Sequence, residues 1–423
     1  MSTIAPTEPK APTETAVPPE TTVATGAGIP PVSKPPARLT SMDAYRGFVM
    51  LLMASEGLGI SHVAEKLKDS AFWQFLKFQT DHVEWVGCSL WDMIQPSFSF
   101  LVGVALPYSI ANRLAKGDTY RQVFKHAVVR SLILIWLGVL LRSDHKPQTY
   151  FTFEDTLSQI GLGYTFLFLL WNRSLKVQIA ALAVILVGYW AAFALFPLPA
   201  AGFDYGKVGV PADWPHHVTG FAAHWDKNTN FANWFDQWFL NLFPREKPFL
   251  YNGGGYLTLS FIPTLGTMIL GLLCGQLLRS EKTATEKIRV MAIAGVSLLV
   301  AGWLLGVTGI CPVVKRIWTP SWTLYSGGIA FLMMAAFFYV VDLKQKQKWA
   351  FPLVVVGMNS IAMYVMAHIF YGLFERNLKT NLGQNFYEIV AGVYAPILEG
   401  TMVLFLLWVV CWWMYRRKLF LKI

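Results

Sequence analysis

A histidine and an aspartate lie ten residues apart in the segment HVEWVGCSLWDMIQPSF, which runs from His82 to Phe98. A histidine that is neutral near pH 7 can take a proton from an amine or a hydroxyl group, and a neighbouring carboxylate can fix its tautomer. Because a carboxylate inside an apolar segment is costly, Asp92 marks either a functional site or a buried partner. The residues alone leave two interpretations open: His82 and Asp92 form a proton-transfer pair, or they are an interfacial histidine and a structural aspartate.

A second polar cluster is the segment CPVVKRIWTPSW at residues 311–322. Here Lys315 stands close in sequence to Trp318 and Ser321. A cation beside an aromatic ring and a hydroxyl group can bind an anion or a sugar. The same residues also suit an interfacial loop whose cations reach toward water.

Two further polar groups interrupt apolar segments. Asp43 and Arg46 are one helical turn apart, so they form a local ion pair or place an arginine where it meets phosphates from the cytoplasmic side. In VGMNSIAMYVMAHIF, Asn359, Ser360 and His368 either hold helices together or donate hydrogen bonds to a substrate carbonyl.

The composition indicates which elements position these residues. Of 423 residues, 54% are hydrophobic and only 14% are charged, whereas soluble domains carry about 25% charge. We therefore expect an all-α polytopic integral membrane protein with about ten transmembrane helices, each of roughly 20 residues. The predicted spans are residues 44–61, 87–110, 123–141, 154–171, 176–196, 256–278, 288–308, 321–342, 350–373 and 394–415.

The distribution of lysine and arginine predicts the orientation of these spans. The cations gather in alternate loops, at residues 113–130, 173–176, 279–289, 344–348 and 416–418. Because basic loops stay in the cytoplasm, we expect both termini there, and His82 and the long aromatic loop at about 197–255 on the outer side. The aromatic residues of that loop either lie on the membrane surface or line a sugar-binding face.

The remaining composition narrows the function further. Residues 1–37 are rich in Pro and Thr and are expected to be a disordered tail before the membrane domain at 38–423. The net charge of +10 is explained by membrane topology, and no nucleic-acid partner is expected. The four cysteines show no CxxC spacing, so neither a disulfide framework nor a metal site is expected.

Taken together, these segments resemble the catalytic domain of heparan-alpha-glucosaminide N-acetyltransferase and its bacterial relatives. The resemblance extends over roughly residues 38–415, and its most specific part is the pattern H-x-x-W-x-G-x(4)-D-x(3)-P from His82 to Pro96. The other residues that carry it are Arg38, Ser41, Asp43, Arg46, Gly47, Pro312, Lys315, Trp318, Ser321, Asp342, Gly357, Met358, Asn359, Ser360 and Tyr364.

The resemblance implies a membrane N- or O-acyltransferase that moves an acetyl group from cytosolic acetyl-CoA to an amino sugar or a sugar hydroxyl. It implies His82 as catalytic base or acetyl carrier and Asp92 as its acidic partner, facing the extracytoplasmic side of a bacterial inner membrane. The residues expected to bind acyl-CoA or substrate are Asp43, Arg46, Gln159, Lys315, Trp318, Ser321, Asn359 and Ser360. The expected partners are acyl-CoA, a glycan or amino-sugar acceptor and the lipid bilayer, and the prediction allows for a homodimer.

The sequence also departs from the family pattern. Glu56, in ASEGLG, stands in a region where relatives often carry Asn, and Gln159, in LSQIG, replaces a common Arg and removes one candidate phosphate contact. A counterpart of the N-terminal lumenal domain of the animal enzyme is not expected, and heparan sulfate is not expected as the substrate. A transporter of a small polar solute and a non-catalytic membrane protein are the alternative functions.

Overall fold

The computed structural model of the chain describes residues 39–421, and it is built almost entirely of helices. The predicted tail at 1–37 lies outside the described residues. Within them the only β-type pairing is an isolated bridge between Val86 and Val314, so the expectation of an all-helical fold is confirmed for this range. The α-helices are α1 Thr40–Ala54, α2 Ile60–Lys66, α3 Ala71–Thr80, α4 Ile94–Ala115, α5 Tyr120–Arg142, α6 Thr156–Leu170, α7 Leu175–Ala194, α8 Phe231–Phe239, α9 Phe261–Arg279, α10 Ala284–Val307, α11 Pro320–Phe337, α12 Phe351–Gly357, α13 Ser360–Leu382, α14 Phe386–Ala391 and α15 Ala395–Arg416.

Seven helices of the described range are long and apolar enough to cross a membrane. Two more spans arise if bent pairs each count as one: α1 with Glu56–Lys66, bent by 48°, and Lys348–Gly357 with α13, bent by 70°. The predicted span 154–171 coincides with α6, whose 15 residues extend roughly 22 Å, less than the ~30 Å hydrocarbon core. Each predicted span thus overlaps a helical segment, and the number of about ten spans stays a prediction.

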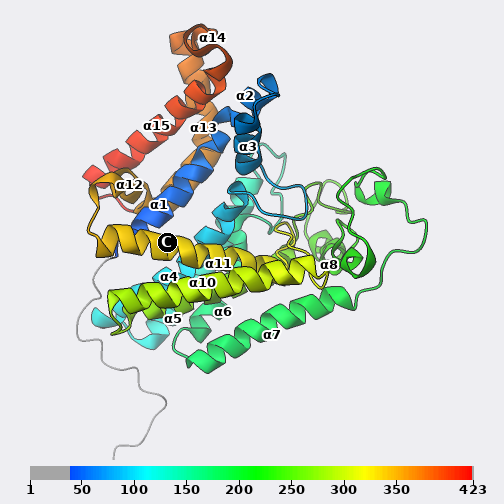
Figure 1. Cartoon of the computed structure of the whole chain (residues 1–423), viewed down its shortest axis with the longest axis horizontal. Helices are drawn as coiled ribbons and strands as arrows, with labels where there is room; N and C mark the ends of the chain where they lie inside the picture. The colour runs from blue at the N-terminus through cyan, green and yellow to red at the C-terminus, as the bar shows by residue number, and fades with distance from the viewer. Residues whose placement is uncertain (1–38, 422–423) are drawn as a thin grey trace, which may run out of the picture.

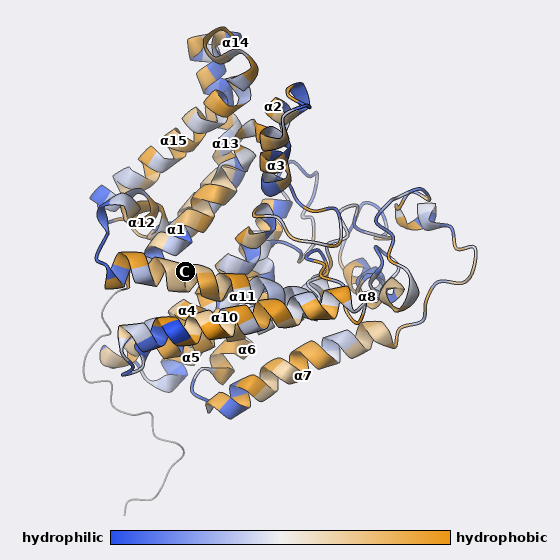
Figure 2. Ribbon diagram, viewed as in Figure 1, coloured by the Kyte–Doolittle hydropathy of each residue, from blue (hydrophilic) through white to orange (hydrophobic). Residues whose placement is uncertain are grey.

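The helices pack against one another mainly in pairs. The main pairs are α10 with α11, α4 with α9, α5 with α6, and α1 with α12. In Figure 1, α7, α10 and α11 run across the picture, α13 and α15 rise above them, and the long loop with α8 gathers at the right end. Figure 2 shows mostly apolar residues along α7, α10 and α11. Most residues of α7 and α10 are not buried, which suits helices that face lipid, whereas α11 is largely buried in the bundle.

Helix α4, which follows directly on the His82 segment, is fixed by close contact with α9. A Cβ added at Gly103 would lie 2.0 Å from the carbonyl oxygen of Met268, and one at Gly271 would lie 1.9 Å from that of Phe100. Only glycine permits this approach of two backbones, as in other small-residue membrane interfaces. The start of α4 is therefore held rigidly against the helix bundle.

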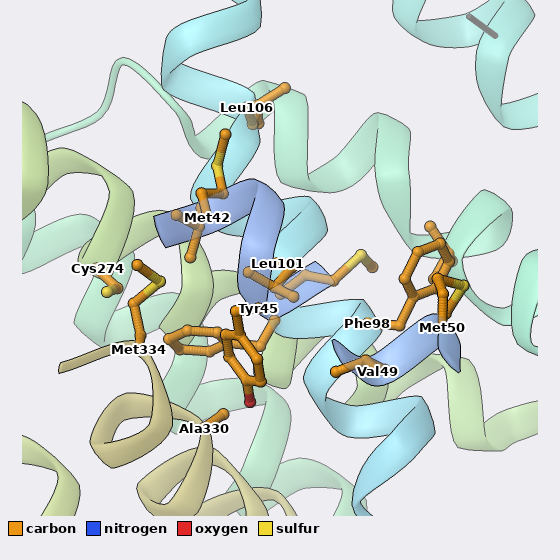
Figure 3. Packing of buried hydrophobic residues seen from close by; sticks show 14 of the residues in the cluster. Met42, Tyr45, Val49, Met50, Phe98, Leu101, Leu106, Cys274, Ala330 and Met334 are labelled. Atoms are coloured by element: carbon orange, nitrogen blue, oxygen red, sulfur yellow. The ribbon is translucent and has the colours of Figure 1, made fainter. Parts of the chain in front are cut away.

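The largest buried cluster joins α1, α4, α9 and α11. Figure 3 shows Tyr45 of α1 packed among these helices, beside Leu101 and Met334. The Tyr45 hydroxyl donates a hydrogen bond to Ser97 Oγ at 2.8 Å, so even its polar atom has a partner inside the bundle. This core places one face of α1 beside the first turns of α4.

A second buried cluster lies outside the helix bundle and packs two loops together. It contains Trp85 from the His82 segment, Val314 and Ile317 from the 311–319 loop, and Tyr189 and Trp225 from α7 and the long loop. Some aromatic residues between positions 214 and 231 pack into this cluster, and others are exposed around it. This part of the long loop therefore forms a small subdomain. This subdomain determines where His82 lies.

Candidate functional site

His82 and Asp92 are in contact. The Nδ1 atom of His82 lies 2.8 Å from Oδ1 of Asp92, and the Asp92 side chain is only 1% exposed. The other carboxylate oxygen, Oδ2, accepts hydrogen bonds from the backbone N–H groups of Val83 and Ser89, each at 3.2 Å. Two backbone donors and one ring nitrogen therefore fix the orientation of this carboxylate.

Lys315 completes the cluster from a position 233 residues away in sequence. Its Nζ atom lies 3.4 Å from Oδ1 of Asp92 and 3.0 Å from Nδ1 of His82. The 2.8 Å contact with Asp92 fits the tautomer in which Nδ1 carries the proton. In that tautomer Nδ1 cannot accept a hydrogen bond from Lys315, whose ammonium group then pairs with Oδ1 of Asp92. Nε2 then holds the free lone pair of the ring, which is the arrangement that a general base or nucleophile needs.

The two loops that carry this cluster are joined by backbone pairing. The Gly87 N–H donates to the carbonyl oxygen of Val313 at 2.9 Å, next to the bridge between Val86 and Val314. The Trp85 ring N–H donates to the carbonyl oxygen of Trp225 at 3.1 Å. His82 and Lys315 are thus held by rigid neighbours on both loops.

Hydroxyl groups stabilise the Lys315 loop from within. Thr319 Oγ1 accepts a hydrogen bond from the Val314 N–H at 3.0 Å, and Ser321 Oγ donates to the Pro312 carbonyl oxygen at 2.7 Å. Ser321 is completely buried. Its hydroxyl holds the turn that carries Lys315, and a direct contact of Ser321 with substrate stays a prediction.

The surroundings of His82 favour the neutral imidazole. Burial lowers the pKa of His82 below its ordinary value of 6.5, and the charges of Lys315 and Arg316 act in the same direction. The hydrogen bond to Asp92 opposes this shift without reversing it. The lowered pKa of His82 favours the neutral form of the ring at neutral pH.

His82 and Lys315 line a cavity of about 570 Å³, a size typical of small-molecule sites. Three groups of residues form its walls. They are Met50, Met53 and Glu56 near the end of α1; Trp91, Ile94, Gln95 and Phe98 at the start of α4; and Tyr364, Ala367, His368, Tyr371 and Gly372 on α13, with Arg142, Glu154, Thr156 and Tyr256 closing the rest.

Two of the lining residues, Arg142 and Tyr364, share a buried carboxylate, Asp155, that the sequence analysis missed. The Tyr364 hydroxyl donates to both carboxylate oxygens of Asp155, at 3.1 and 3.3 Å, and Arg142 Nε lies 3.4 Å from Asp155 Oδ2. Asp155 also caps α6 by accepting from the Leu157 N–H at 2.9 Å. The cap is readable from an aspartate before an apolar run, but its contacts with Arg142 and Tyr364 depend on tertiary packing.

Gln159 and Trp318 lie next to the cavity without lining it. Both border a void of about 10 Å³ beside Lys315. The Gln159 amide donates to the carbonyl oxygens of Phe153 and Thr258, at 2.7 and 3.1 Å, and Trp318 donates to Thr267 Oγ1 at 3.1 Å. Both side chains therefore support the wall behind Lys315, and a direct substrate contact for either stays a prediction.

The remaining predicted residues lie elsewhere. Arg46 is 3.7 Å from Asp43 in the first half of α1. The Asn359 amide donates to the Leu419 carbonyl oxygen and accepts from the Leu421 N–H, each at 3.1 Å, at the break before α13, which begins with Ser360. Asn359 thus fastens the end of α15 to this break, and a role in substrate binding stays a prediction.

Comparison with known proteins supports the resemblance seen in the sequence, although no protein-family model matches the chain. The chain is 24% identical to heparan-alpha-glucosaminide N-acetyltransferase of Homo sapiens over 427 aligned residues, which cover 92% of this chain. It is 24% identical to the Mus musculus protein of the same name, over 91% of this chain. The chain spans about 60% of the length of these relatives. The similarity is that of a distant relative.

Proposed function

We propose that this protein is a membrane acyltransferase that moves an acetyl group from acetyl-CoA to an amino group or a hydroxyl group of a sugar. The observation that carries the proposal is the cluster of His82, Asp92 and Lys315 at the wall of a cavity of about 570 Å³. The distant relatives, which are named as N-acetyltransferases, support the same reaction class.

In the direct route, Nε2 of His82 takes the proton from the acceptor nitrogen or oxygen as that atom attacks the thioester carbonyl. A new C–N or C–O bond forms and the C–S bond breaks. The sulfur of CoA takes the proton from His82, and CoA leaves as its thiol. Asp92 stabilises the imidazolium that exists between these two events. Lys315 places a positive charge beside the same carboxylate and raises the cost of a protonated ring, which favours return of the proton.

In a two-step route, Nε2 attacks the thioester carbonyl, the C–S bond breaks and CoA leaves as its thiolate. The acceptor then attacks the acetyl carbon, the bond from that carbon to Nε2 breaks, and the freed ring nitrogen takes the acceptor's proton. The same geometry serves this route, because Asp92 again holds Nδ1–H and leaves Nε2 as the nucleophile. Mass spectrometry after incubation with acetyl-CoA alone separates the two: an acetyl group on His82 supports the second route, and ternary-complex kinetics without such an adduct support the first.

The donor is proposed to approach along α1. Met50 and Met53 line the cavity, and Arg46 lies on the same helix face, about 10 Å along the helix axis from Met53. The guanidinium of Arg46 can pair with a phosphate of CoA in bidentate geometry. This places the pantetheine arm beside the methionines and the thioester near His82, with donor and acceptor entering from opposite ends.

Purified protein in nanodiscs tests the proposal with acetyl-CoA and glucosamine, by CoA release and by mass spectrometry of the sugar. We expect His82→Ala to abolish transfer and to leave the elution profile of the folded protein unchanged. His62→Ala is the matched control, because the His62 side chain is 74% exposed on α2. Full activity of His82→Ala would refute the assignment of His82, and uptake of a solute by proteoliposomes without any acetyl transfer would favour the transporter.

A further inference from the structure

A second cavity, of about 470 Å³, lies between the loop after α5 and the segment before residue 252. Three cationic side chains line it, Lys146, Arg245 and Lys247, against a single carboxylate, Glu246. Three aromatic side chains also line this cavity, those of Tyr150, Phe249 and Tyr251. Cations and aromatic rings in one concave surface are the groups that bind a negatively charged sugar, because the rings contact its C–H faces while the cations pair with its charge.

The cations of this basic cavity converge on a shared ring. Lys146 Nζ lies 5.5 Å from the centre of the Tyr150 ring, and the guanidinium carbon of Arg245 lies 5.4 Å from the same centre. Arg245 is also 5.4 Å from the Phe249 ring. Two like charges held on one ring repel each other, so an anion between them would be favourable.

Arg245 is fixed before any ligand binds. Its Nε donates to the carbonyl oxygen of Leu240 at 2.7 Å, and Nη2 donates to the carbonyl oxygen of Phe151. Within residues 39–421, no ion pair of 4.0 Å or less involves Lys146, Arg245 or Lys247. Arg245 is therefore held in place, whereas Lys146 and Lys247 are exposed. The largely buried carboxylates of Glu154 and Asp236 lie within electrostatic range of Arg245 but do not form a close ion pair with it.

Two short stretches of chain connect the basic cavity to the cavity lined by His82 and Lys315, which we call the catalytic cavity. Tyr150 and Tyr251 line the basic cavity, whereas Glu154 and Tyr256 line the catalytic one. Asn252 Nδ2 donates to Glu154 Oε2, so the two stretches lie against each other. Four or five extended residues span at most about 18 Å, which is within the reach of a short oligosaccharide.

We propose that the basic cavity binds an anionic group of the acceptor saccharide and holds its chain while another sugar unit enters the catalytic cavity. This inference rests on the proposed function, because it names the acceptor as an acidic glycan. Anionic lipid headgroups share the same chemistry, and the experiment separates these two sources.

The test measures binding by calorimetry in phosphatidylcholine nanodiscs, with His82→Ala protein so that no turnover interferes. The probes are N-acetylchitotetraose and its carboxymethylated derivative. We expect the carboxymethylated probe to bind about tenfold more tightly than the neutral one and to lose that advantage in high salt. Adding Lys146→Gln and Lys247→Gln should weaken the carboxymethylated probe about tenfold and leave the neutral probe unchanged.

The control is the pair Lys66→Gln and Lys68→Gln, which removes the same charge from exposed positions that line neither cavity. Equal affinity for the two probes, or an equal loss in the control pair, would overturn the proposal. Nanodiscs that contain phosphatidylglycerol provide a second way to overturn it. If this lipid abolishes binding of the carboxymethylated probe, and does so only while Lys146 and Lys247 are present, the cavity is a lipid site. Since the readout is binding, a failure of acetyl transfer would count against the proposed function and not against this site.

Discussion

At His82, one ring nitrogen is held by Asp92 and the other remains for chemistry. The structural basis is a carboxylate with five close donor groups, which come from His82, Lys315, Val83 and both the backbone and the hydroxyl of Ser89. A histidine at a membrane interface without such partners would rotate freely and sample both tautomers. These contacts favour the proton-transfer interpretation over an interfacial histidine, and the role itself stays a prediction.

The activity should depend on pH through His82. Since burial and the charge of Lys315 lower its pKa below 6.5, kcat/KM should be constant from pH 7 to 8 and fall as the pH drops through that lowered pKa. Lys315→Gln removes one cause of the lowering, so the midpoint should move to higher pH. A midpoint that stays in place, as expected for the control Lys68→Gln, would contradict this role of Lys315.

Asp92→Asn should lower kcat by about 10²–10⁴-fold, because an amide neither fixes the Nδ1–H tautomer nor stabilises the imidazolium. The variant keeps the volume of the side chain, so the protein should still elute as a folded monodisperse species. Asp81→Asn, in the same loop and exposed, should retain the activity of the parent protein. Comparable kcat values for the two variants would show that Asp92 has only a structural role.

Among the elements, the decisive pair is the His82 segment and the 311–319 loop. The two segments meet through irregular backbone and not through helices. The aromatic cluster around Trp85 and Trp225 buries this contact and holds it in place. Membrane helices supply the platform for this cluster through α7, whose Tyr189 hydroxyl donates to the Ile317 carbonyl oxygen at 2.9 Å. The site is thus a loop constellation on a helical scaffold.

Stability of the scaffold should respond to the contact of α4 with α9. Gly271→Ala should destabilise the protein by about 1–3 kcal/mol or more, because the new Cβ would meet the Phe100 backbone at 1.9 Å. Gly188→Ala, where no atom lies within 4 Å, is the control and should be neutral or stabilising. Thermal unfolding in detergent measures both, and equal melting temperatures would contradict the close packing.

For the molecule as a whole, the proposed reaction requires access from both sides of the membrane, one for the donor and one for the acceptor. The basic loops and the His82 segment lie at different ends of the spans, and transfer across the membrane follows only if the basic end is cytoplasmic. The cavity then receives the acceptor from the outer side and the donor along α1.

Labelling of intact cells with a membrane-impermeant maleimide tests this orientation. Thr149→Cys should react without lysis, whereas Lys282→Cys should react only after the membrane is made permeable. The parent protein is the control, because three of its four cysteines are buried and Cys88 is partly so. The reverse pattern of labelling would place His82 in the cytoplasm.

The sequence by itself determined the helices, because apolar segments of sufficient length have few other stable conformations in a bilayer. It placed His82 and Asp92 ten residues apart but left open whether they meet, and the structure brings Nδ1 of His82 to 2.8 Å from Oδ1 of Asp92. Only the tertiary structure decided that Lys315 joins them and that Ser321 supports the turn. It also decided that Arg142 and Tyr364 line the same cavity and share the buried Asp155. These contacts join segments far apart in the chain, and the packing of aromatic side chains between loops, which has no periodic pattern, brings them together.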